Sequence, residues 1–101
     1  MLKRKENRTN IDNTRATGLI LEHLISLEYE GKRGQTIYGI RTKAFDNSQR
    51  DERIKYLVRL HKAGYIDSFQ SGEDKTLYVI NEKGRDFFHG SVEKVMNLFR
   101  E

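Results

Sequence analysis

Cysteine and proline are both absent from this chain of 101 residues. Without cysteine it has no disulfide framework and no thiolate metal site, and we expect it to work inside the cell, in the cytoplasm. Without proline, long uninterrupted helices are permitted. No apolar run is long enough to cross a membrane, and the basic start is followed by no apolar stretch, so neither a membrane span nor a secretory signal is expected.

Basic side chains are concentrated in the middle of the chain. The formal net charge is +4, and residues 32–62 carry nine basic and three acidic side chains. Residues 63–101 carry five basic and seven acidic ones. A polyanionic partner would therefore be met by the middle segment. The same pattern also fits solvated helix faces that only keep the protein soluble.

The length predicts one domain, which we place at residues 13–101 after a flexible basic arm of residues 1–12. A first helix is predicted from about residue 13 to Gly31, capped by Asp12, Asn13 or Thr14. Its apolar stripe consists of Ala16, Ile20, His23, Leu24 and Leu27.

Two further helices follow a loop that contains Lys32 and Arg33. The second is predicted over Ile37–Ala44, with Thr36 as its cap and with Ile37, Ile40 and Phe45 on its apolar side. The third is predicted over 47–63, with Gly64 as its stop signal. Its inward stripe is expected to be Ile54, Leu57, Val58 and His61, bordered by Leu60.

A β-hairpin and a last helix complete the pattern. Residues 65–69 and 76–80 are rich in strand-forming types and flank a turn at 71–74. Asn81 is expected to cap a helix over about 81–100. The predicted fold class is mainly α with a small β-hairpin (α+β), a winged helix-turn-helix with an extra C-terminal helix.

Two stretches carry a resemblance to a known group of proteins. Residues 60–66, Leu-His-Lys-Ala-Gly-Tyr-Ile, look like the end of a recognition helix entering a wing strand. Residues 75–85, Lys-Thr-Leu-Tyr-Val-Ile-Asn-Glu-Lys-Gly-Arg, look like the second wing strand running into the next helix. Over about residues 14–100 the chain resembles the MarR-, PadR- and TubR-like small winged-helix DNA-binding proteins. The resemblance implies a helix that lies in the major groove of DNA.

The third helix is accordingly the predicted reading element. Its base-reading side chains are expected to be Gln49, Arg50, Arg53 and Tyr56, since Gln suits adenine and Arg suits guanine. Phosphate contacts are predicted for Lys32, Arg33, Arg41, Thr42, Lys43, Ser48, Lys55, Arg59 and Lys75. A solvated helix surface that binds nothing is the alternative.

The wing and the last helix raise separate expectations. The wing tip holds Glu73 and Asp74 beside Lys75, which does not suit entry into a minor groove. A heptad-like seam in the last helix predicts a dimer interface. The seam residues are Phe88, Val92, Val95 and Phe99.

Catalytic patterns are not found. His23, His61 and His89 are far apart in sequence, and His23 and His61 fall on apolar stripes. The glycines of residues 31–39 lack the Walker spacing, and no nucleophile has a recognisable setting. We therefore expect no enzyme activity, no metal, no cofactor and no evident small-molecule ligand.

The sequence as a whole predicts a homodimeric, nucleoid-associated transcriptional regulator that binds double-stranded DNA. One alternative keeps the DNA but makes the chain a replication or partition site-binding protein of a plasmid or phage. A second alternative is a winged-helix protein-interaction module that binds no nucleic acid, which the acidic wing would suit.

Overall fold

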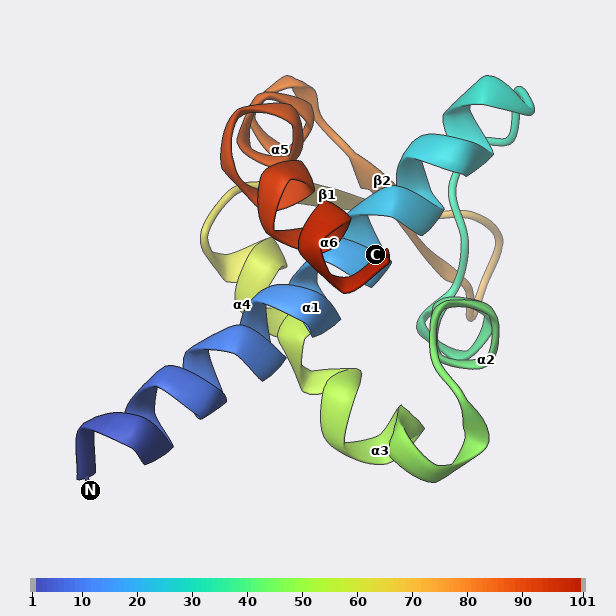
Figure 1. The fold of residues 1–101 in the computed structure, drawn as a ribbon. Coiled ribbons are helices and arrows are strands. Elements are labelled where there is room, and N and C mark those ends of the chain that lie inside the picture. Colours follow the sequence, from blue (N-terminus) through green and yellow to red (C-terminus); the bar gives the residue numbers. More distant parts are fainter. Residues whose placement is uncertain (1, 101) are drawn as a thin grey trace.

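The structure, a computed structural model, describes the backbone of residues 2–100 and the side chains of residues 14–46 and 48–98. In chain order the elements are α1 (Leu2–Tyr29), α2 (Ile37–Ala44), η1 (Asn47–Gln49), α3 (Arg50–Arg53), α4 (Lys55–Lys62), β1 (Ile66–Gln70), β2 (Thr76–Ile80), α5 (Glu82–Phe87), η2 (Phe88–Val92) and α6 (Glu93–Arg100). Helices followed by one antiparallel hairpin and a C-terminal helical unit confirm the predicted α+β winged helix-turn-helix (Figure 1).

Helix α1 runs through the middle of the molecule, and the other elements are arranged around its C-terminal half (Figure 1). It begins at Leu2, so the predicted start near residue 13 is wrong. No proline or glycine precedes Gly18, and nothing in the backbone chemistry therefore breaks the helix earlier. Whether residues 1–12 act as a flexible arm stays a prediction, because their side chains lie outside the described residues.

A glycine closes α1 as predicted. Gly31 has a φ of +76°, and its N–H donates to the carbonyl of Glu28 at 3.0 Å. The next N–H, of Lys32, donates to the carbonyl of Leu27 at 2.9 Å. This pair of bonds satisfies carbonyls that the helix end would leave without a partner.

Helix α2 has the predicted bounds and the predicted cap. The Thr36 hydroxyl accepts from the N–H of Gly39 at 3.2 Å. Ile40 and Phe45 are buried as expected, whereas Ile37 is exposed, so its place on the apolar side was wrong.

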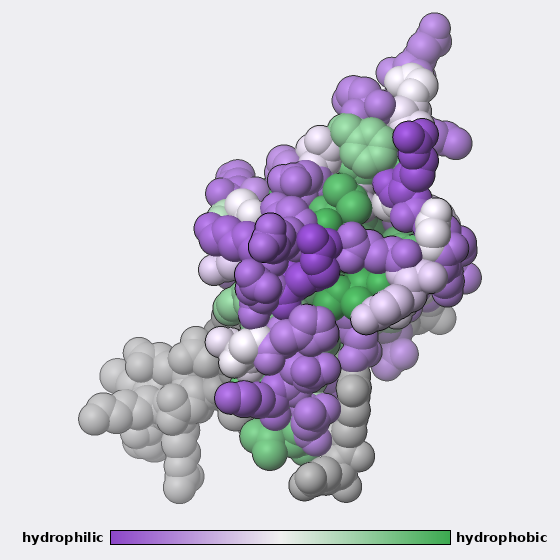
Figure 2. All heavy atoms as spheres, turned by 90° about the horizontal axis from the view of Figure 1, so that it is seen from above, coloured by the Kyte–Doolittle hydropathy of each residue, from purple (hydrophilic) through white to green (hydrophobic). Residues whose placement is uncertain are grey.

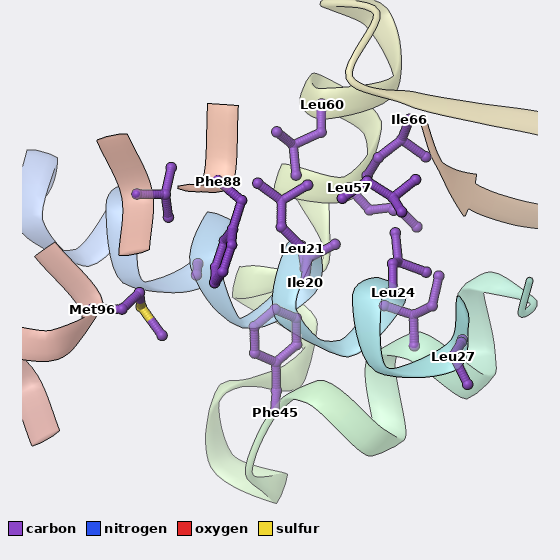
Figure 3. Close-up of a cluster of buried hydrophobic side chains, with 14 residues drawn as sticks. Ile20, Leu21, Leu24, Leu27, Phe45, Leu57, Leu60, Ile66, Phe88 and Met96 are labelled. Carbon is purple, nitrogen blue, oxygen red and sulfur yellow. The ribbon is translucent and has the colours of Figure 1, made fainter. Parts of the chain in front are cut away.

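The predicted third helix is divided into η1, α3 and α4. The break lies at Ile54, where the N–H of Leu57 donates to the carbonyl three residues back instead of four. Beyond the break, Leu57 and Leu60 are buried against α1 (Figure 3). Val58 and His61 are exposed, so their predicted place on the inward stripe is wrong, because the buried side of α4 runs through Leu57 and Leu60 and each of these two residues lies one position further round the helix.

Gly64 ends α4 in the same way that Gly31 ends α1. Its φ is +87°, and the N–H of Tyr65 donates to the carbonyl of Leu60 at 3.0 Å. The hairpin of β1 and β2, which is the wing of this fold, follows, with Ile66 opposite Ile80 and Gln70 opposite Thr76.

An isolated β-bridge joins the loop after α1 to the hairpin, which the sequence did not predict. Gln35 and Tyr78 exchange two backbone hydrogen bonds of 3.1 and 2.8 Å. Gly34 stands beside this bridge with a φ of +116°, and a Cβ there would lie 2.6 Å from the carbonyl oxygen of Tyr78. The loop after α1 is thereby fixed against the base of the wing.

Asn81 caps the C-terminal helical unit as predicted, because its side-chain oxygen accepts from the N–H of Gly84 at 2.8 Å. A π-helical turn, η2, separates α5 from α6. Phe88 and Met96 point from this unit toward α1 (Figure 3), and Val92 is buried in the same cluster. One hydrophobic core thus includes residues from every helical unit except η1 and α3.

Candidate nucleic-acid interface

The outward side of α4 is cationic. Lys55 and Lys62 lie opposite the buried Leu57 and Leu60, and both are exposed. Arg59 flanks them on one side, also exposed. The phosphate contacts predicted for Lys55 and Arg59 therefore fall on an accessible face.

Val58 flanks the same lysines on the other side and is 42% exposed. The sequence placed it inward because it fits an i, i+3, i+4 stripe with Ile54 and Leu57. The sequence alone does not show that the buried side of this helix runs through Leu57 and Leu60, which leaves Val58 outside it. An exposed apolar side chain beside cations can contact the methyl group of a thymine.

The N-terminal part of the predicted reading element, η1 and α3, lies on the surface. Ser48 and Glu52 are exposed, and Gln49 and Arg53 are half-buried. Gln49 and Arg53 thus keep part of their polar surface accessible, as base reading requires. Glu52 places a carboxylate on the same face, which disfavours close approach of a phosphate.

Arg50 points toward α2 instead of outward. Its Nε donates to the carbonyl of Phe45 at 3.1 Å, and its Nη2 donates to the carbonyl of Thr42 at 2.9 Å. Arg41 of α2 donates to Asp51 of α3. Its Nε and Nη2 lie 2.9 and 2.6 Å from Oδ1 of the carboxylate. Two arginines that were predicted to contact DNA therefore hold α2 and α3 together.

Tyr56 is half-buried and packs against the core. The guanidinium of Arg59 lies 5.0 Å from the centre of its ring, and the Lys55 ammonium lies 5.6 Å from it. The tyrosine lies on the side of α4 that is turned toward Tyr65 and Phe87. Its role in base reading stays a prediction.

The remaining predicted phosphate contacts are spread over three elements. Lys43 and Arg33 are exposed, whereas Lys32 forms an ion pair of 3.2 Å with Glu30. The Thr42 hydroxyl donates to the carbonyls of its own helix. At the wing tip Lys75 is exposed, and so are the two acidic residues beside it. The face of the molecule seen in Figure 2 is mostly hydrophilic, with hydrophobic side chains gathered near its centre.

The predicted dimer seam is only partly available. Phe88 and Val92 are 4% and 3% exposed in the single chain, so both belong to its own core. Val95 is half-buried, and the side chain of Phe99 lies outside the described residues. Leu98, which the seam did not include, is 70% exposed. The dimer itself stays a prediction.

A shallow apolar groove of about 270 Å³ lies between α1, α4 and α5. Tyr56, Arg59 and Leu60 line it from α4. Tyr65 and Phe87 form the other wall, with their rings stacked 4.5 Å apart. The sequence indicated no such groove, because its walls come from distant segments.

Other kinds of site find little support in the described part of the chain. It contains no group of three or more His, Cys, Asp or Glu side chains that could hold a metal ion. None of its helices has the length and apolar character that crossing a membrane requires. The exposed His61 is hydrogen-bonded through Nε2 to Ser68 Oγ at 3.0 Å, and the edge of its ring meets Tyr78. This contact joins α4 to the wing.

Comparison of the chain with protein-family models, with curated proteins and with solved structures gave no match. What the outward face of α3 and α4 binds must therefore be argued from its own residues.

Proposed function

We propose that this protein binds double-stranded DNA in a sequence-specific manner and acts as a homodimeric transcriptional regulator in the cytoplasm, at the nucleoid. The observation that carries the proposal is the cationic outward face of α4. Lys55, Arg59 and Lys62 share this face, and the opposite side of the helix is anchored in the core. A rigid helix with one buried and one cationic side suits insertion into the major groove.

The two parts of the reading element have different tasks in this proposal. The exposed cations of α4 contact phosphates, which sets affinity and position but not sequence. Gln49 and Arg53 contact base edges from the N-terminal part, where Gln pairs with adenine and Arg with guanine. Arg33 in the loop after α1 and Lys43 in the last turn of α2, both exposed, add contacts to the DNA phosphates.

The resemblance of residues 60–66 and 75–85 to MarR-, PadR- and TubR-like proteins supports the same function. A homodimer would place two reading elements about one helical turn of DNA apart and would favour a palindromic or repeated site. The exposed Leu98 and the half-buried Val95 of α6 are the parts of the last helix left for such an interface.

Selection of bound sequences from a random duplex library tests the proposal. We expect one enriched motif, and we expect Arg53→Glu to abolish binding to it. Arg85→Glu is the matched control, since Arg85 lies in α5 and pairs with Glu28 at 2.8 Å, away from the reading element. An Arg53→Glu variant that binds the motif as tightly as the parent would remove α3 from the interface.

The acidic wing tip favours a second candidate function, a protein-interaction module without nucleic-acid binding. Glu73 and Asp74 are both exposed there, and they would repel a phosphate backbone. Binding of random duplex at low salt separates the two functions, because the interaction module is expected to bind none. A role in replication or partition instead of transcription shares the interface, and the position of the bound sites in a genome distinguishes it.

A further inference from the structure

The link between α2 and α3 has a consequence for DNA recognition. Of the described side chains in η1 and α3, none is buried, so the core does not hold this segment in place. The backbone bonds at its two ends, Gln49 N–H to the Asp46 carbonyl and Ile54 N–H to the Arg50 carbonyl, are local turn bonds that reach no other element. Yet this segment carries Gln49 and Arg53.

Helix α2 also ends differently from α1 and α4. Those two helices end at a glycine in the left-handed region, whose backbone bonds satisfy the last carbonyls. Helix α2 is followed by Phe45 with extended backbone, and no glycine is present at this end. The guanidinium of Arg50 instead donates to the carbonyls of Thr42 and Phe45. A cation at a helix C-terminus is also favoured by the helix dipole.

We propose that Arg50 and Arg41 form a clasp that positions the base-reading segment Asn47–Arg53. Arg50 reaches from α3 back to the end of α2, and Arg41 reaches from α2 to Asp51 of α3. The two contacts run in opposite directions across the turn at residues 45–49, so together they restrict both the separation and the rotation of the two helices.

The two halves of the clasp are unequal. The carboxylate of Asp51 is 87% exposed, and water and salt weaken an ion pair in that setting. The hydrogen bonds of Arg50 are partly buried, and their acceptors are carbonyls at the end of α2, where helix geometry by itself supplies no partner. Arg50 is therefore the principal positioning residue, and Arg41 is the auxiliary one.

This inference rests on the proposed function for its effect on DNA, but its structural half is measurable in the free protein. Arg50→Met removes the donors and keeps the length of the side chain. Arg85→Met is the control, because it removes the same charge and a two-bond contact with Glu28 at the other end of the molecule.

Amide hydrogen exchange of the free protein is the first measurement. In Arg50→Met we expect exchange at Gln49 and Ile54 to be at least about tenfold faster, with core amides of α1 unchanged. Unchanged exchange at these two amides would overturn the proposal, and Arg85→Met should leave them unchanged. If the Arg50→Met protein loses protection from exchange at all its amides, the Arg50→Lys variant is measured instead. A folded lysine variant with fast exchange only at residues 46–54 supports the clasp, and a globally unfolded one contradicts it.

Selection from random duplexes is the second measurement. A positioning role predicts that Arg50→Met relaxes the preference at several adjacent base pairs, with the salt dependence of binding unchanged. Relaxation at a single base pair would instead make Arg50 a base reader, and uniform weakening with a flatter salt dependence would make it a phosphate contact. Either result overturns the proposal. A parent protein that selects no motif refutes the proposed function alone, and the exchange measurement still decides the clasp.

Discussion

Replacing Gly84 by alanine tests the packing of the C-terminal helical unit on the wing. A Cβ at this position would lie 2.2 Å from the carbonyl oxygen of Tyr65 and 2.8 Å from Cγ1 of Ile80. The first neighbour is backbone at the start of the wing, and the same carbonyl accepts from the N–H of Asn81. The helix must therefore move away from the hairpin to make room for the methyl group.

The expected cost follows from two opposing effects. Overpacking against a backbone atom costs about 3 kcal/mol at the upper end of its usual range. Alanine in place of glycine in a helix raises the free energy of unfolding by about 1 kcal/mol. The net loss is about 2 kcal/mol, which lowers the melting temperature of a domain of this size by about 8–16 °C.

Gly90, in the π-helical turn of the same unit, is the matched control. A Cβ there meets nothing within 4 Å, and its backbone is not in the left-handed region. Gly90→Ala should therefore raise stability by up to about 1 kcal/mol. Thermal and urea denaturation of both variants measure the two effects. A Gly84→Ala protein as stable as its parent would refute the packing described for α5 against the wing.

Two further predictions concern the proposed DNA interface. Lys55→Met should weaken binding to all duplexes alike. It should also flatten the slope of log K against log salt by about 0.9, the value for one phosphate contact. Titrations at several salt concentrations measure this slope. An unchanged slope would mean that Lys55 contacts no phosphate. For Val58, replacing one thymine of the selected motif by uracil should weaken binding of the parent about fourfold, the effect of burying one methyl group. The Val58→Ala variant should be insensitive to that replacement, and equal sensitivity in both proteins would exclude a methyl contact by Val58.

The features of the fold that could be predicted from the sequence are local ones: helix caps, helix ends and the hairpin. Thr36 and Asn81 cap the helices expected of them, because an N-cap depends on a side chain and an N–H only three residues apart. Gly31 and Gly64 end helices for an equally local reason. The hairpin strands were predicted almost to the residue.

Features that depend on distant segments could not be predicted. The i, i+3, i+4 pattern favoured Val58 and His61 for the inward side, whereas packing on α1 buries Leu57 and Leu60 instead. Phe88 and Val92 read as a seam for a second copy because the sequence does not show that α1 covers them. Arg50 was assigned to DNA because its acceptors, the carbonyls at the end of α2, are invisible in a side-chain pattern.

Binding of the parent protein to a random-sequence duplex at low salt, followed by fluorescence anisotropy, tests the central claim most directly. The cationic face of α4 predicts saturable binding, with a dissociation constant that rises toward about 10⁻⁶–10⁻⁴ M at physiological salt. Absence of binding at low salt would contradict the claim that α3 and α4 form a nucleic-acid interface, and would favour the protein-interaction module.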